Sequence, residues 1–113
     1  MNRYKFLLLA LIALFSLSAN ADFRTIARAH EVVLSDFSAP ASPNGMAGFK
    51  SCADCKRMNV RVTPETRYVL NRRDVTLRQF RDALAAVTDR DAPTVVVLHH
   101  LESDVVLRIS TDL

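Results

Sequence analysis

The sequence contains no tryptophan and only two glycines, and aromatic residues make up 7% of its 113 residues. It has no glycine-rich loop of the kind that holds phosphates, no Gly-x-Ser-x-Gly nucleophile turn and no His-Glu-x-x-His helix. Its aromatic residues are not interleaved with basic ones, which argues against stacking on nucleic-acid bases. The sequence therefore argues against an enzyme and against a nucleic-acid-binding protein, and it predicts no cofactor.

Only one long apolar run is present, and it lies close to the start of the chain. The twelve residues from Phe6 to Leu17 are apolar apart from Ser16, and Arg3 and Lys5 precede them. The segment closes on Ala19-Asn20-Ala21, which has the small-x-small pattern of a cleavage site. Because twelve residues are too few to span a bilayer comfortably, this pattern is typical of a secretory signal peptide.

Cleavage near Ala21-Asp22 divides the chain into a leader, residues 1–21, and a mature part of 92 residues. The leader carries two basic residues and no acidic one, so its removal lowers the net charge from +3 to +1 and leaves no charge argument for nucleic-acid binding. A mature part of this size forms one domain. We expect the mature protein to be periplasmic or secreted. The chain should contact the membrane only transiently, through its signal peptide during export.

The two cysteines, Cys52 and Cys55, form a Cys-x-x-Cys motif. Because disulfides persist in exported proteins, the motif predicts a disulfide, which stabilises a small domain by about 2 kcal/mol or less when so few residues are enclosed. The first alternative is a thiol–disulfide redox protein. Lys56 would favour a thiolate and Asp54 would oppose it, but the alternating segment Arg57–Thr63 predicts a strand where a redox motif usually opens a helix.

A zinc or copper site is the second alternative. Cys52 and Cys55 would supply two thiolates, and His99 and His30 the imidazoles. His99 and His100 point to opposite faces of a strand, so only one of them can join a given site. Such a site also requires thiols that stay reduced after export, which the compartment disfavours.

Three arginines form a candidate surface for anions or for a partner. Arg57, Arg61 and Arg67 share the outward face of a predicted hairpin, where guanidinium groups can bind phosphates or carboxylates. The alternative is a solvated face in which Glu65 pairs with one of them.

Residues 22–51 comprise an N-terminal segment and a loop rich in proline, glycine and serine. The segment allows two interpretations, and we favour a strand near Glu31–Asp36 after a short helical lead-in. The helical alternative rests on apolar spacing at Phe23, Ile26, His30, Val33 and Phe37. Ser38–Ser51 is predicted to be a mobile loop, because its small and turn-forming residues can bury little surface.

Residues 52–113 are predicted to form the core. Met58–Thr63 and Arg67–Asn71 alternate apolar and polar residues around a turn, which predicts a β-hairpin. A capping box at Thr76 and Gln79 begins a helix that is expected to end near Thr88–Asp89.

Two further strands complete the predicted core. Thr94–Leu101 is a continuous β-branched run typical of a strand covered on both faces, and an alternating strand begins at Val105. The predicted fold class is α+β, with a single sheet of four to five strands, one amphipathic helix on one face and the order (β)-β-β-α-β-β.

Two segments, Tyr68–Leu84 and Thr94–Leu98, resemble the strand–helix–strand portion of the ExbD/TolR periplasmic domain. The resemblance implies a periplasmic module that works by protein contacts beside an energised membrane channel. The membrane anchor of that family carries an aspartate, whereas Phe6–Leu17 has no acidic residue, and His99 stands where an acidic residue is usual. We therefore carry over no functional residue and interpret the resemblance as shared local architecture.

Together these features predict a small exported, non-catalytic module. We expect it to bind a protein partner or an envelope component through its sheet and loops.

Overall fold

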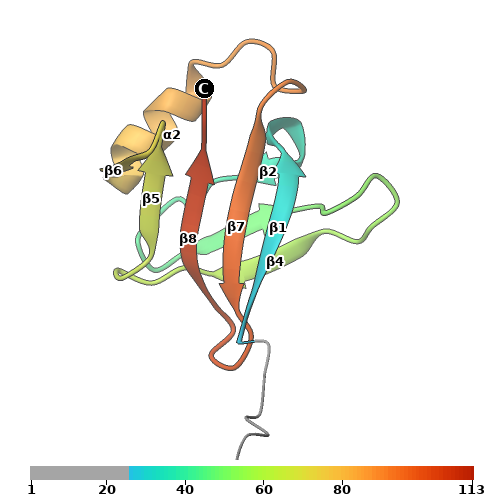
Figure 1. The fold of residues 1–113 in the computed structure, drawn as a ribbon, viewed down its shortest axis with the longest axis vertical. Coiled ribbons are helices and arrows are strands. Elements are labelled where there is room, and N and C mark those ends of the chain that lie inside the picture. The colour runs from blue at the N-terminus through green and yellow to red at the C-terminus, as the bar shows by residue number, and fades with distance from the viewer. Residues whose placement is uncertain (1–25) are drawn as a thin grey trace, which may run out of the picture.

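The computed structural model describes residues 26–113, so the predicted signal peptide lies outside the described residues. No helix within residues 26–113 is long and apolar enough to cross a membrane. The described part contains eight strands, one short 3₁₀ helix and one α-helix (Figure 1). Their bounds are β1 Ala27–Val33, η2 Leu34–Asp36, β2 Phe37–Ser38, β3 Met46–Phe49, β4 Met58–Arg61, β5 Arg67–Leu70, β6 Arg73–Val75, α2 Leu77–Ala85, β7 Thr94–His100 and β8 Val105–Thr111.

All eight strands belong to one mixed sheet. Its main order is β1-β7-β8-β4-β3-β2, and β5 pairs with both β8 and β6. The pairings of β8 with β4 and with β5 are parallel, and the other pairings are antiparallel. In Figure 1, β1, β7, β8 and β5 run side by side as a front layer, and β2, β3 and β4 cross behind them. The front layer therefore has an inner face toward the second layer and an outer face on the opposite side.

The core lies between the two layers and is built from alternate residues of the strands. Val95 and Val97 of β7 and Phe49 of β3 are fully buried there. Helix α2 contributes Phe80, whose ring centroid lies 5.5 Å from that of Tyr68. Burying these side chains removes their apolar surface from water, which is the main favourable contribution to folding.

Helix α2 begins where the sequence predicts. The Thr76 hydroxyl accepts a hydrogen bond from the Gln79 amide (3.1 Å), and the Gln79 side chain accepts one from the Thr76 amide (3.0 Å), so the capping box is confirmed. The helix ends at Ala85, before the predicted end at Thr88–Asp89. Arg90 donates a hydrogen bond to the Leu84 carbonyl (2.9 Å), which also accepts one from the Val87 amide (3.3 Å), so the carbonyl has partners beyond the helix end.

The predicted α+β class, with a sheet of four to five strands in the order (β)-β-β-α-β-β, is wrong, because the described structure is mostly sheet, with eight strands and a single short α-helix. The additional strands are short. β2 has two residues and β6 three, and the four residues of β3 lie inside Ser38–Ser51, the predicted loop. Segments of this length are too short to show a period of two, so partners elsewhere in the chain define them. The favoured strand near Glu31–Asp36 is also displaced, since β1 begins at Ala27, where a helical lead-in is expected, and ends at Val33, where η2 follows.

The predicted hairpin of Met58–Thr63 with Arg67–Asn71 is not formed. β4 and β5 each pair in parallel with β8 instead of with one another. The turn between them is tied to β8 by the buried Thr66 hydroxyl, which donates to the Val106 carbonyl (2.7 Å). One edge of β8 pairs with β4 at Val105 and with β5 from Arg108 onward. The Thr66 hydroxyl gives the Val106 carbonyl, which lies between these two pairings, a hydrogen-bond partner.

Candidate functional site

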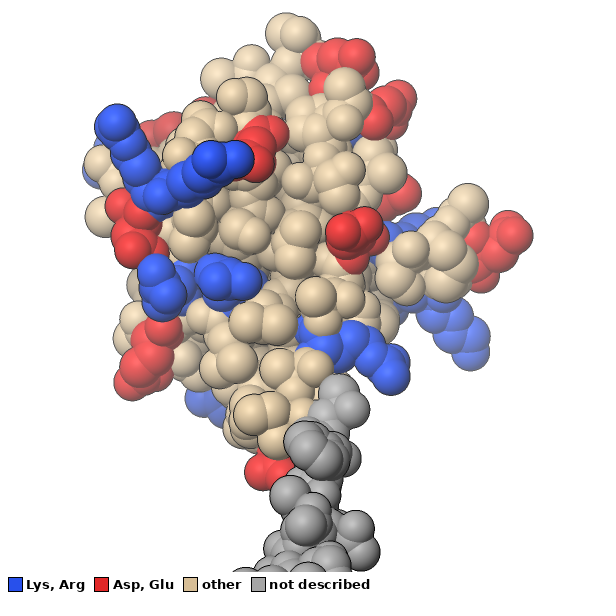
Figure 2. All heavy atoms as spheres, in the orientation of Figure 1, with Lys and Arg blue, Asp and Glu red and all other residues tan. Residues whose placement is uncertain are grey.

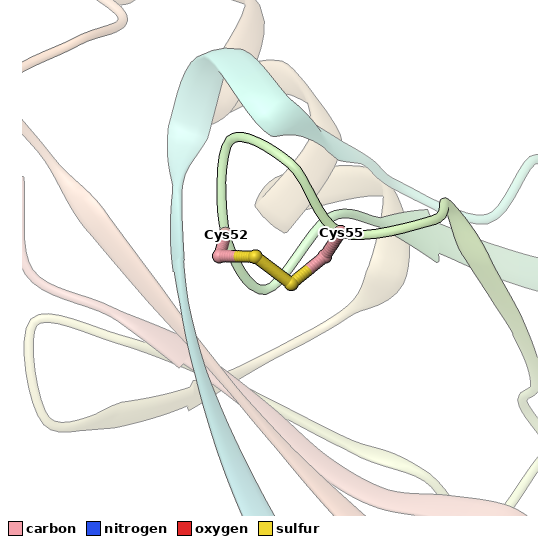
Figure 3. Close-up of a disulfide and its surroundings, with 2 residues drawn as sticks. All are labelled: Cys52 and Cys55. Carbon is pink, nitrogen blue, oxygen red and sulfur yellow. A yellow bond between two sulfur atoms is a disulfide. The ribbon is translucent and has the colours of Figure 1, made fainter.

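The two cysteines lie in the loop that joins β3 to β4 (Figure 3). They form a disulfide, and their Cα atoms are 5.0 Å apart. The Cys55 amide donates to the Cys52 carbonyl (3.2 Å), so the bond closes a single tight turn. Cys52 is exposed and Cys55 half-buried, and the segment that follows is β4 rather than a helix. Neither thiol would therefore be stabilised by a helix N-terminus if the bond were reduced.

The four residues of the predicted metal site divide into two separate features of the structure. The two cysteine sulfurs are bonded to each other, whereas His30 and His99 pack together with ring centroids 6.0 Å apart. Residues 26–113 contain no group of three or more histidine, cysteine, aspartate or glutamate residues that could hold a metal ion.

The histidine pair lies on the inner side of β1 and β7. His99 is buried and its Nε2 atom lies 2.6 Å from the Asp104 carboxylate, in a turn where Asp104 takes a positive φ of 56°. His30 lies 5.1 Å from Phe49 between ring centroids, and its buried Nε2 atom has no hydrogen-bond partner. Burial, followed by the neighbouring charges of His99 and Arg28, lowers the pKa of His30.

Two of the three candidate arginines have intramolecular partners. Arg67 forms a bidentate ion pair with Asp74 across β5 and β6, with contacts between 2.9 and 3.2 Å. Arg57 donates to the Ser38 hydroxyl and crosses Gly48, where an added Cβ would lie 2.7 Å from the guanidinium. Arg61 is exposed on β4. These contacts give Arg57 and Arg67 structural roles besides any part in binding anions.

The sequence does not predict that the outer face of the front layer is uncovered. Val96 and Leu98 of β7 are half-buried there, while Val95 and Val97 are fully buried on the inner face. Figure 1 shows no described element over β7 and β8 on this side. In Figure 2 the same face is uncharged in its middle, with acidic and basic side chains around its margin. The apolar side chains of Val96 and Leu98 thus lie on an uncharged surface with charged groups around it, and apolar side chains rimmed by polar groups are typical of a binding site.

Sequence reasoning missed the charged residues that line a hollow on this face, which are Glu31, Arg72, Arg108 and Asp112. One signal was available, because Asn71-Arg72 separates two short alternating segments and a leading asparagine is typical of a two-residue hairpin turn. Comparisons with protein-family models, curated proteins and solved structures find no match to this chain. The resemblance to the ExbD/TolR domain therefore stays a prediction.

Proposed function

We propose that this protein is a small exported, non-catalytic module that binds a protein partner or an envelope component on its outer sheet face. The observation that carries the proposal is the half-buried apolar row of Val96 and Leu98, which no described element covers. Val33 on β1 adds to this surface and is 39% exposed. Leaving such side chains in contact with water forgoes the hydrophobic stabilisation that covering them would bring, and a docked partner supplies that cover.

Export is supported by the signal-peptide pattern at Phe6–Leu17 and by a disulfide of the kind that persists outside the cytoplasm. The strands beneath the face are each seven residues long in the centre of the front layer, where β7 pairs with β1 on one side and β8 on the other.

Site-specific photo-crosslinking tests the proposal. A photo-crosslinking residue in place of Leu98 should join the exported protein to one reproducible partner or envelope polymer. The same residue in place of Met46 should not, because Met46 is 52% exposed but belongs to β3 in the other layer. Equal crosslinking from both positions, or none from Leu98, would contradict the proposal.

A further inference from the structure

The outer face carries a hollow of about 590 Å³ near the end of β8. Four charged residues line it, namely Glu31, Arg72, Arg108 and Asp112. Two are acidic and two are basic, so the hollow has no excess charge of one sign. A strongly anionic surface such as a lipid headgroup layer or a nucleic acid is therefore not the ligand that these charges favour.

The floor of the hollow is one row of residues that crosses four strands. Register pairs Glu31 with Val96, Val96 with Ser110, and Ser110 with Val69. The row thus runs from an acidic side chain on β1, over small and apolar residues, to the end of β5 beside Arg72. Three strand spacings separate the backbones at its two ends, which is about 14 Å.

The charges of the hollow are not neutralised within the described part of the molecule. Ion pairs among residues 26–113 are those of Arg67 with Asp74 and of His99 with Asp104. Glu31 and Arg108 lie two strands apart and in neighbouring rows, since Arg108 pairs with Leu98 rather than Val96. The sheet therefore holds Glu31 at one side of a floor of small and apolar residues and Arg108 and Arg72 toward the other, where the second acidic residue, Asp112, follows the end of β8.

We propose that this hollow binds a short zwitterionic peptide, with its ammonium group beside Glu31 and its carboxylate beside Arg72 and Arg108. An extended peptide of two or three residues spans roughly 7–10 Å, which fits between side chains that reach inward from backbones about 14 Å apart. Guanidinium groups bind carboxylates with paired, directional hydrogen bonds. Val69 and Val96 provide an apolar floor for small side chains. This ligand class deepens the proposed binding function and rests on it.

The conformation of Arg72 supports a role for its side chain. Asn71 and Arg72 form the two-residue turn between β5 and β6, with φ values of 51° and 68°. The second position of such a turn favours glycine, because a side chain there is strained by its left-handed backbone. An arginine at this position, lining the hollow, is consistent with a side chain that binds a ligand.

Calorimetric titration with three peptides tests the proposal on the mature protein. The peptides are L-alanyl-L-alanine, its N-acetylated form and its C-terminal amide. Each blocked form should bind about tenfold more weakly than the free peptide, because it loses one charge-assisted contact. Glu31→Gln should abolish the preference over the acetylated peptide alone. Arg108→Gln should weaken the preference over the amide alone, because Arg72 remains. Arg78→Gln, an exposed change on α2, should alter neither preference.

Absence of binding by the free peptide, or equal affinity for all three peptides, would overturn the inference. The Leu98 crosslink distinguishes this failure from a failure of the proposed function. A specific crosslink without peptide binding would contradict the ligand class and leave the docking face in place. Peptide binding with both preferences but no crosslink would support the ligand class and contradict the macromolecular partner.

Discussion

The two faces of β7 have nearly the same amino-acid composition but differ in how far their side chains are buried. Val95, Val97 and His99 point into the core and are buried, whereas Val96, Leu98 and His100 alternate with them and are only half-buried. The sequence of this strand predicts a cover on both sides, but the described structure supplies one. The comparison teaches that a continuous apolar strand has two explanations, a second layer of the same chain or a binding surface.

The largest expected effect comes from placing a charge on each face of β7 in turn. Val97→Asp buries an unpaired carboxylate in the core, which should cost several kcal/mol, comparable with the whole stability of a small domain. Val96→Asp should cost about 1 kcal/mol or less and leave the protein folded. Urea denaturation followed by circular dichroism measures both. If Val96→Asp unfolds the protein as Val97→Asp does, the outer face is not open.

The disulfide should contribute less to the free energy of unfolding than the core does, since it closes only one turn of the β3–β4 loop. Replacing both Cys52 and Cys55 by serine is expected to lower the free energy of unfolding by about 2 kcal/mol or less. The same denaturation experiment measures this change. Two results together would instead support the redox alternative: a thiol pKa well below about 7 in the reduced protein, and a disulfide that glutathione readily opens in the oxidised protein.

Arg72→Gly should change stability and binding in opposite directions. Glycine relieves the left-handed strain of the turn, so the free energy of unfolding should rise by roughly 0.5–1 kcal/mol. The affinity for the free peptide should fall, because one guanidinium is lost from the hollow. Thermal melting and calorimetry measure the two effects. A more stable variant with unchanged peptide affinity would show that Arg72 does not contact the ligand.

The smallest expected effect comes from His30. The pKa of His30 lies below its ordinary value of 6.5, so the unfolded chain takes up this proton at a higher pH than the folded protein does. The contribution of His30 to stability is therefore fully present above pH 6.5 and is lost as the pH falls below it. His30→Gln should flatten this dependence. A pH profile of stability that this variant leaves unchanged would contradict the assignment to His30.

The sequence predicts those parts of the fold that depend on neighbouring residues. The capping box of α2 and the strand that begins at Val105 follow from short segments, and both are present. The parallel pairing of β5 with β8 was not predictable in this way, because its partners are about forty residues apart, as Arg67 and Arg108 show. The Cys52–Cys55 disulfide follows from the spacing of the two cysteines together with the expected export. The hollow does not, since Glu31, Arg72 and Arg108 meet only through the register of four strands.

Solvent accessibility of individual methyl groups tests the central claim most directly. A soluble paramagnetic agent should broaden the NMR signals of the Val96 and Leu98 methyl groups in the isolated mature protein. It should spare those of Val95 and Val97, which are buried in the core. Addition of the partner that crosslinking from Leu98 identifies should then protect the Val96 and Leu98 methyl signals from broadening as well. Equal protection of all four residues in the isolated protein would contradict an open outer face and the binding function proposed for it.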